Sequence, residues 1–418
     1  MTKTSFPRFS TEGAAILGVS ALVLTGCSAS APAAPDSSAG AAPAQVSPAA
    51  AGTCGSVPTD AANDPNGLLA DFPEEIAEGY NLYPYEIRKS AWAGYKSPKE
   101  GGFTAAIVGM PPASPFIASM SEAIRTSLQD NGVKIVGDFA PDDPSNVPLQ
   151  LQQFNEALSL KPDVIIYTAI APQPSVGLAK AAHDAGIPLV AAQIPIDSEF
   201  AVSVTRNTPL AVAQVTAGTV GALGGKGTVL RVEGIPGIPA STFANMGIDA
   251  VLKNCPEIKV AGSVTGFFQP ATAQVEVQKF LATNPAGVDG VLQAGTMGVG
   301  IRNAFEESGM EVPPIADDGS SHGFSSWALA NPDYPFFGTT TPSVRTGEAV
   351  VDVALRILKG DGPKINQIVQ PSVIVSRENL ATMADRSWNH NDLTDLAGAP
   401  EDYLPIDRLN EFFTQSDK

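Results

Sequence analysis

The sequence is poor in the residues on which metal sites and nucleic-acid interfaces depend. It has three histidines and three cysteines in 418 residues, and the histidines at 183, 322 and 390 are scattered along the chain. Zinc sites need closely spaced Cys and His ligands, so we expect no metal, and no cofactor motif stands out. Lys and Arg number 25 against 43 Asp and Glu, giving a net charge of −18. Because phosphate binding needs clustered positive charge, this balance argues against a nucleic-acid partner.

The first apolar run, Ala14–Leu24, is too short to span a hydrocarbon core about 30 Å thick. Lys3 and Arg8 precede it and small residues follow, as in a secretory signal. Its end, Leu-Thr-Gly-Cys at 24–27, resembles the bacterial lipobox, in which the cysteine is diacylated and becomes the first residue of the mature chain. The resemblance implies a signal peptide at 1–26 and a lipid on Cys27 that anchors the protein to the outer face of a bacterial membrane.

The stretch that follows lacks anything with which to build a core. Residues 28–52 are almost entirely Ala, Ser, Pro and Gly, without apolar periodicity. We therefore expect 27–52 to be a disordered tether. About 365 residues remain, which is enough for two domains of ordinary size.

Two cysteines remain once Cys27 is set aside. In an oxidising compartment, Cys54 and Cys255 are candidates for one disulfide. Two free thiols are the alternative, because spatial proximity cannot be read from sequence.

From residue 103 onward, short apolar runs alternate with longer amphipathic segments. Four runs form a first set, at 103–109, 133–138, 163–169 and 187–192, and four form a second set, at 227–232, 258–264, 288–294 and 312–317. Apolar strands that do not alternate with polar residues and are separated by helices indicate parallel sheets covered on both faces. The pattern predicts an α/β fold of two Rossmann-like lobes, with a ligand cleft between them at the carboxyl ends of the strands.

The opening unit, AAIVGMPPASPFIASMSEAIRTSLQDNGVKIV, resembles that of the ribose-binding type (type I) of periplasmic substrate-binding proteins. LKPDVIIYTAIAP, VTRNTPLAVAQ, GTVLRVEGIPG, ADDGS and PSVIVSRENL continue the resemblance in order over about 101–380. It implies a monomeric, non-enzymatic lipoprotein that binds a small ligand and delivers it to the permease of an ABC importer. It also implies a three-strand hinge, with crossings near Asn207, Thr341 and Gln370.

These crossings divide the chain into lobes and extensions. We expect an N-terminal extension at 53–100, a first lobe at 101–206 plus 341–370, a second lobe at 207–340 plus 371–380, and a C-terminal extension at 381–418. Both extensions are expected to pack on the outside of the lobes.

The resemblance also suggests ligand-binding positions. Ser114, Phe116 and Ile117 match the family's Asn-Pro-Phe-Phe site, where aromatic rings stack on a sugar, but only the first phenylalanine is retained. Asp318 keeps its expected acidic type, whereas other polar positions of the family are lost. The full expected set is Ser114, Phe116, Ile117, Gln173, Asn207, Phe243, Phe268, Gln269, Thr296, Asp318 and Thr341.

The type of ligand stays open at this point. Few charges and many apolar residues favour a flatter aromatic, terpenoid or ring-bearing acid. A shift of register by one or two residues would instead place a conventional sugar site on neighbours such as Arg206, Asn207 and Gln269.

Two other functions fit parts of the sequence. GSSHG at 319–323 matches the G-x-S-x-G motif of a hydrolase nucleophile elbow, with Ser321 as nucleophile, His390 as base and Asp352 as acid. Asp317 and Asp318 directly before it would oppose an oxyanion, which argues against this alternative. A ligand-sensing receptor of the same fold is the second alternative.

Overall fold

The computed structural model describes residues 52–112, 114–340, 342–397 and 404–414. The expected signal peptide, Cys27, most of the tether and Thr341 lie outside the described residues. Within the described ranges, no helix is both long and apolar enough to cross a membrane.

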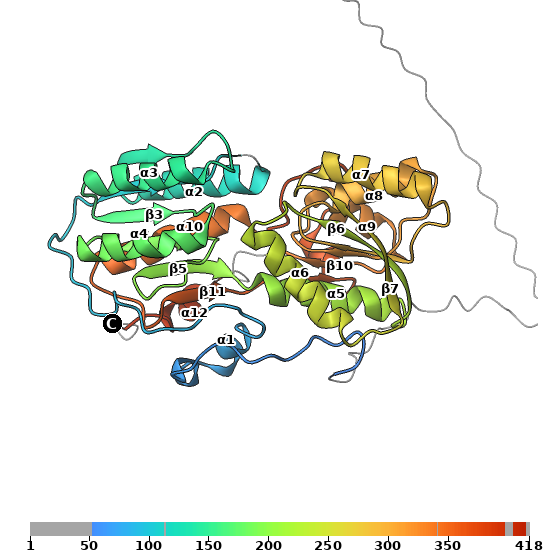
Figure 1. Ribbon diagram of the computed structural model, residues 1–418, viewed down its shortest axis with the longest axis horizontal. Coiled ribbons are helices and arrows are strands. Elements are labelled where there is room, and N and C mark those ends of the chain that lie inside the picture. Colours follow the sequence, from blue (N-terminus) through green and yellow to red (C-terminus); the bar gives the residue numbers. More distant parts are fainter. Residues whose placement is uncertain (1–51, 113, 341, 398–403, 415–418) are drawn as a thin grey trace, which may run out of the picture. The chain divides into compact units, whose positions relative to one another are not determined.

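The first lobe is built on a six-stranded parallel sheet in the order β11-β5-β4-β3-β1-β2. Its strands are β1 (Thr104–Val108), β2 (Lys134–Phe139), β3 (Val164–Tyr167), β4 (Leu189–Ala192), β5 (Ala201–Arg206) and β11 (Gln367–Gln370). Helices α2 (Pro115–Asp130) and α10 (Ser343–Leu358) pack together, and α3 (Val147–Ser159) contacts α4 (Pro172–Asp184) (Figure 1).

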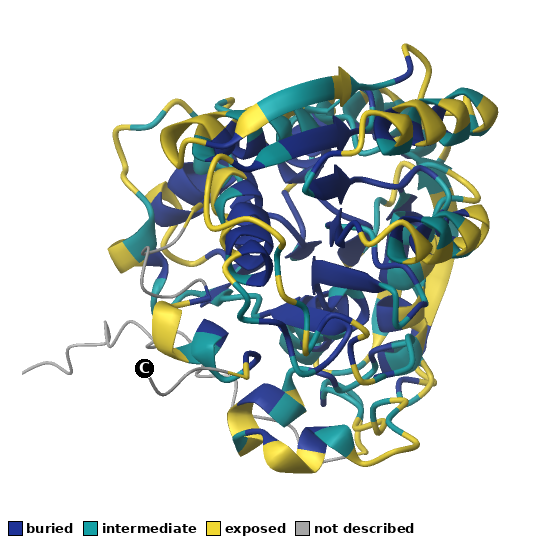
Figure 2. Cartoon of the chain, turned by 90° about the vertical axis from the view of Figure 1, so that its left-hand side faces the viewer, coloured by how far each residue is buried: buried dark blue, intermediate teal, exposed yellow. Residues whose placement is uncertain are grey.

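Alternate strand residues of this lobe enter two separate cores. Ile107 and Ile166 belong to the cluster of α2 and α10, whereas Val108 and Ile165 belong to the cluster of α3 and α4. Both clusters are apolar because helices cover both faces of the sheet, which explains why the strands read as continuous apolar runs. Figure 2 shows most of these strands as buried, apart from the edge strand β2, with exposed residues on the helices outside them.

The second lobe repeats this arrangement in a sheet of order β12-β10-β9-β8-β6-β7. Its strands are β6 (Gly227–Glu233), β7 (Ile258–Thr265), β8 (Gly290–Gln293), β9 (Ile315–Asp317), β10 (Phe337–Thr339) and β12 (Ile374–Ser376). Its helices are α5 (Thr208–Ala222), α6 (Pro239–Leu252), α7 (Pro270–Thr283), α8 (Gly298–Glu307), α9 (His322–Ala330) and α11 (Leu380–Met383). The predicted fold of two similar α/β lobes is confirmed.

One strand departs from the prediction of parallel sheets, because β12 pairs antiparallel with β10. Only residues 371–373 separate β12 from β11 of the first lobe. The chain therefore leaves the first sheet and enters the second sheet without turning back on itself. The parallel strands of each lobe end at the cleft, so a strand that starts at the cleft must run against them.

In the part of the chain that the structure describes, three passages link the two sheets. The passages lie between β5 and α5, between β10 and α10, and between β11 and β12. Asn207 and Pro371 mark the first and third, and the second includes the undescribed position 341.

The two extensions do more than cover the lobes, because their side chains complete the cores. The first contains η1 (Leu68–Asp71) and α1 (Glu74–Glu78), and the second contains α12 (Ile406–Asn410). Phe72 and Phe412 lie in the core of the first lobe with ring centroids 5.4 Å apart. Leu396 instead belongs to the core of the second lobe.

Candidate functional site

A cavity of about 190 Å³ lies between the carboxyl ends of the two sheets. Its lining comes from both lobes and from the first passage between them. The lining residues are Met110, Pro111, Ser114, Phe116, Ile117, Pro144, Gln193, Ile194, Arg206, Thr208, Ile235, Ile238, Ala240, Phe267, Phe268, Gln269, Ala294, Gly295, Thr296, Asp318 and Gly319. Ligands of open α/β sheets bind at this edge, so we take the cavity as the candidate binding site.

The first lobe contributes the start of α2. The Ser114 hydroxyl accepts the backbone N–H of Ile117 at 3.3 Å and so caps the helix, and Pro115 occupies its first position. Proline there supplies a suitable φ and lacks an N–H that would have no partner. The cap fixes the half-buried Phe116 and Ile117 at the cavity wall.

The second lobe contributes the starts of α6 and α7. The Phe268 ring lies so close to Gly234 that a Cβ there would be 2.1 Å from the ring. A side chain at position 234 would therefore displace the ring. Phe267 is 45% exposed at the same wall.

The charged residues of the cavity lining are Arg206 and Asp318, and they pair with each other. Arg206, at the end of β5, donates through Nη2 to Asp318 Oδ2 at 2.5 Å, and the side chains are only 8% and 4% exposed. The other Asp318 oxygen accepts the Thr339 hydroxyl at 2.8 Å. The pair joins the first lobe to the second at the base of the cavity and leaves this region with no net charge.

Four cavity residues have left-handed backbones although none is glycine. They are Gln193, Phe267, Phe268 and Thr296, with φ between 56° and 64°. Such conformations cost roughly 1–3 kcal/mol each and concentrate at functional sites. Their gathering here supports a binding role for the cavity.

Seven of the expected ligand-binding residues line the cavity. They are Ser114, Phe116, Ile117, Phe268, Gln269, Thr296 and Asp318. Three others do not, and Thr341 lies outside the described residues. Gln173 is exposed on the first turn of α4. Asn207 caps α5 and bonds the N-terminal extension, and Phe243 packs on Tyr85 of that extension.

Sequence reasoning missed the residue that holds the loops at the cavity base in the first lobe. The buried Gln150 side chain donates to the carbonyl oxygens of Gly109 and Thr168, at 2.7 and 2.9 Å, and accepts the N–H of Ile170 at 2.8 Å. It therefore ties the ends of β1 and β3 together. An amide on an amphipathic helix gives no sign of this role, because its partners come from other loops.

Asp317 lies next to Asp318 but is buried away from the cavity. Its Oδ1 accepts Gln293 Nε2 at 2.6 Å, while its Oδ2 is buried without a hydrogen bond. Burial raises the pKa of Asp317 to about 7, and the neighbouring Asp318 charge adds to the rise. At this pKa, roughly half of the Asp317 carboxyls carry a proton at pH 7.

The hydrolase triad is not assembled. The Ser321 hydroxyl accepts the N–H of Phe324 and caps α9, whereas Asp352 lies on α10 of the first lobe. The neighbouring histidine in the sequence, His322, stacks its ring on Trp388, with ring centroids 3.7 Å apart. Among the described residues, no group of three His, Cys, Asp or Glu side chains could hold a metal ion.

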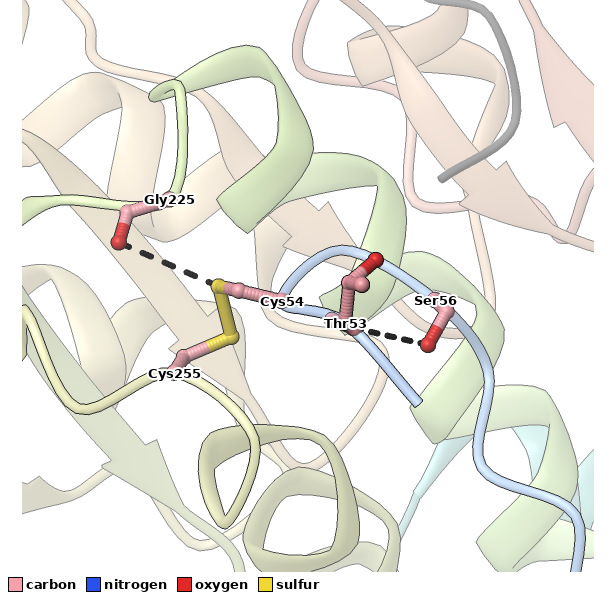
Figure 3. The surroundings of a disulfide bond; sticks show 5 residues. All are labelled: Thr53, Cys54, Ser56, Gly225 and Cys255. Atoms are coloured by element: carbon pink, nitrogen blue, oxygen red, sulfur yellow. Dashed lines mark hydrogen bonds between the residues drawn. A yellow bond between two sulfur atoms is a disulfide. The ribbon is translucent and has the colours of Figure 1, made fainter. Parts of the chain in front are cut away.

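Cys54 and Cys255 form a disulfide in the structure and are not two free thiols (Figure 3). Cys255 follows α6 in the second lobe, and Cys54 lies at the start of the N-terminal extension. Cys54 Sγ is 3.9 Å from the carbonyl oxygen of Gly225, in the turn after α5.

Comparison with solved structures supports the fold. An ABC transporter solute-binding protein from Mycobacterium smegmatis with bound glycerol has a TM-score of 0.61 at 17% identity, covering 72% of this chain and all of that one. Another from Bacillus halodurans with bound myo-inositol has a TM-score of 0.59 at 16% identity, covering 68% of this chain and 98% of that one. At these identities the likeness shows the fold alone.

Sequence comparison supplies the family. A xylitol-binding protein from Mycolicibacterium smegmatis is 27% identical over 276 residues, which are 64% of this chain and 76% of that protein. The periplasmic binding protein domain matches residues 106–362, more than half of the chain. These solute-binding relatives agree with the expectation that the chain is not an enzyme. The chain belongs to the periplasmic binding protein family.

Proposed function

We propose that the protein is the extracytoplasmic solute receptor of an ABC importer and that it binds a neutral sugar or polyol between its lobes. The relatives support this class of ligand, since one is named for xylitol and two solved structures hold glycerol and myo-inositol. A ring-bearing acid, which the sequence alone left open, is disfavoured by the arrangement of charge in the cavity.

The observation that carries the proposal is the buried Arg206–Asp318 pair. Its two charges cancel, so an anionic or cationic ligand beside it would add a charge that the lining does not balance. An unbalanced buried charge is costly, whereas hydroxyl groups can hydrogen-bond to a carboxylate and a guanidinium. Neutral polyhydroxylated compounds are therefore the ligands that best suit the Arg206–Asp318 pair.

The walls add a second requirement. Phe116 and Ile117 from the first lobe and Phe267 and Phe268 from the second present apolar surface to the cavity. The C–H faces of a sugar ring or cyclitol can pack against such side chains, while its hydroxyl edge meets Arg206 and Asp318. We propose Ser114, Gln269 and Thr296 as further hydrogen-bonding groups.

The remaining parts of the proposal concern delivery. A lipid on Cys27 would hold the protein at the outer face of the membrane, and a permease would receive the ligand from the two lobes. We also propose the lobe and extension boundaries expected from the sequence, which the three passages between the sheets support. Metabolic labelling with radioactive palmitate tests the anchor, and the label should be lost in Cys27→Ala.

The binding proposal is tested by a thermal-shift panel on the full chain, with pentitols, cyclitols, aldoses and the corresponding aldonic and uronic acids. A ligand present at 100 times its Kd should stabilise the protein by about 2.7 kcal/mol. We expect neutral members to raise the melting temperature and acids to have little effect. Asp318→Ala should abolish the shift, whereas Gln173→Ala, an exposed control, should keep it.

Two outcomes would contradict the proposal. Stabilisation by the acids but not by their neutral counterparts would show that the Arg206–Asp318 pair does not select for neutrality. A neutral compound that stabilises Asp318→Ala as well as the wild type would place its site outside this cavity.

A further inference from the structure

We propose that the N-terminal extension is a brace that spans both lobes and limits how far they can part. The brace is residues 54–92, and it contacts the first passage at Asn207 and the strand β11 that leads into the third passage. This inference goes beyond the proposed function and does not depend on which solute the cavity binds.

The brace begins with a covalent attachment to the second lobe. The Cys54–Cys255 disulfide joins residues 201 positions apart. Around it, Gly55 lies against α5, where an added Cβ would be 3.2 Å from Gly221 Cα, and Val57 packs on the core of the second lobe. The start of the extension must therefore move with the second lobe.

The later part of the brace is fixed to the first lobe. The Tyr80 hydroxyl donates to the carbonyl oxygen of Gln367 at 2.6 Å, and the Tyr83 hydroxyl donates to Gln367 Oε1 at 2.9 Å. Gln367 begins β11, which leads into the third passage. Trp92 Nε1 donates to the carbonyl oxygen of Phe200 at 2.8 Å. Tyr80, Tyr83 and Trp92 are all buried in the core of the first lobe.

The brace also holds the hinge itself at the first passage. Asn207 Nδ2 donates to the carbonyl oxygens of Gly79 and Asn81, at 2.9 and 2.5 Å. Its Oδ1 accepts the N–H of Leu210 and caps α5. Because the Asn207 side chain is buried and bonds both the helix and the extension, rotation at this passage must move the extension or break these bonds.

A row of aromatic rings then crosses from the first lobe to the second. The ring centroids of Tyr80 and Tyr83 are 5.7 Å apart, those of Tyr83 and Tyr85 are 5.9 Å apart, and those of Tyr85 and Phe243 are 5.6 Å apart. Phe243 lies on α6, whose first residues line the cavity. Tyr85 therefore links the part of the brace fixed to Gln367 with a helix at the edge of the cavity.

Parting of the lobes must strain this connection. Movement of α6 away from the first lobe separates Phe243 from Tyr85, or else pulls the tyrosines away from Gln367. The disulfide keeps the other end of the brace on the second lobe, so the brace cannot simply detach and follow the first lobe. The contact at Tyr85 and the covalent bond at Cys54 thus act together against opening.

The test measures the distance between the lobes in the full chain without ligand. Non-canonical spin-labelled residues replace Glu122 on α2 and Val275 on α7, both exposed and outside the brace. Pulsed electron paramagnetic resonance then gives the distribution of distances. We expect Tyr85→Ala to shift it to longer and broader distances. Cys54→Ser with Cys255→Ser should add to the shift, and Tyr85→Phe should restore the wild-type distribution.

Tyr95→Ala is the matched control. Tyr95 is a half-buried tyrosine that follows the brace but packs on Trp92 and the core of the first lobe. Its loss should lower thermal stability without changing the distance between the lobes. The proposal is wrong if Tyr85→Ala and the double serine variant both give the wild-type distribution, or if Tyr95→Ala shifts it as far as Tyr85→Ala does.

Discussion

Two adjacent aspartates at the end of β9 have different surroundings. Asp318 lies at the cavity base, paired with Arg206 and bonded to Thr339. Asp317 lies beneath it, near the start of α8, where a Cβ on Gly298 would be 2.3 Å from its Oδ1. Alternation along a strand sends neighbouring side chains to opposite faces, so one carboxylate can meet a ligand while the other is withdrawn from water.

The raised pKa of Asp317 predicts a pH dependence of stability. The folded state keeps a proton on this group between its ordinary pKa of 3.8 and about 7, while the unfolded state releases it. The contribution of this group to stability is therefore full below about pH 4 and is lost as the pH rises towards 7. Asp317→Asn cannot titrate at this position and should not lose this stability. Each unit by which the pKa is raised corresponds to about 1.4 kcal/mol in the free energy of unfolding.

Urea unfolding of Asp317→Asn and wild type between pH 4 and 8 checks this prediction. The difference in the free energy of unfolding should move in favour of the variant as the pH rises and then level off above 7. Asp143→Asn serves as the control, because the N–H of Ser145 lowers the pKa of the exposed Asp143 below its ordinary 3.8. The group is therefore ionised in both the folded and the unfolded state above about pH 5, so the difference for this variant should stay level there. A difference for Asp317→Asn that stays constant with pH would contradict the account.

At this scale, sequence identified the residues whose position follows from a local motif. Ser114, Phe116 and Ile117 lie where the first strand gives way to a helix. Their match to the family's Asn-Pro-Phe-Phe site is therefore enough to predict that they lie at the cavity. The role of Arg206 depends on Asp318, which is 112 positions away and in the other lobe. Phe243, also expected in the binding set, packs its ring on Tyr85 and is not among the residues that line the cavity, and no local pattern reveals that contact.

Among the elements, helices α7 and α8 pack unusually closely. A Cβ on Gly300 would lie 1.8 Å from the carbonyl oxygen of Pro270, the first residue of α7. A backbone atom cannot give way as a flexible side chain can, so α8 reaches this position only because residue 300 is glycine. The pair also positions the two turns that carry Gln269 and Thr296 to the cavity.

Gly300→Ala should therefore destabilise the protein by about 1–3 kcal/mol, the usual cost of overpacking. Gly177→Ala on α4 is the matched control, since no atom lies within 4 Å of its added Cβ and the residue is exposed. Because alanine is a better helix former, this control should gain up to about 1 kcal/mol. Chemical unfolding measures both, and equal effects of the two substitutions would contradict the close-packing argument.

Sequence predicted most elements of the two lobes because buried parallel strands leave a continuous apolar signal. The predicted strand at 163–169 corresponds to β3, and that at 187–192 to β4, and every residue of both strands is buried. The predicted strand at 312–317 is shorter in the structure, where β9 begins only at Ile315, after two prolines that cannot donate to a sheet. The direction of β12 follows from the hinge, which short apolar runs do not describe.

For the whole molecule, the repeat of two strand sets predicted two lobes, and the family resemblance predicted where they are joined. The extensions were expected to be peripheral, yet their aromatic side chains fill the core of the first lobe. These aromatic residues leave no periodic pattern in the sequence, because each one reaches the core from a different turn of the extensions. The N-terminal extension also restrains the hinge, so lobe movement involves a part of the chain beyond the two lobes.

The central claim, that a neutral solute binds between the lobes at Arg206 and Asp318, is tested most directly by titration calorimetry. The neutral sugar or polyol that stabilises the protein most should be titrated into wild type, Asp318→Ala and Gln173→Ala, alongside its acid counterpart. We predict saturable binding of the neutral compound to wild type and Gln173→Ala, a loss of at least tenfold in affinity in Asp318→Ala, about 1.4 kcal/mol, and no binding of the acid. Unchanged affinity in Asp318→Ala, or tighter binding of the acid, would contradict it.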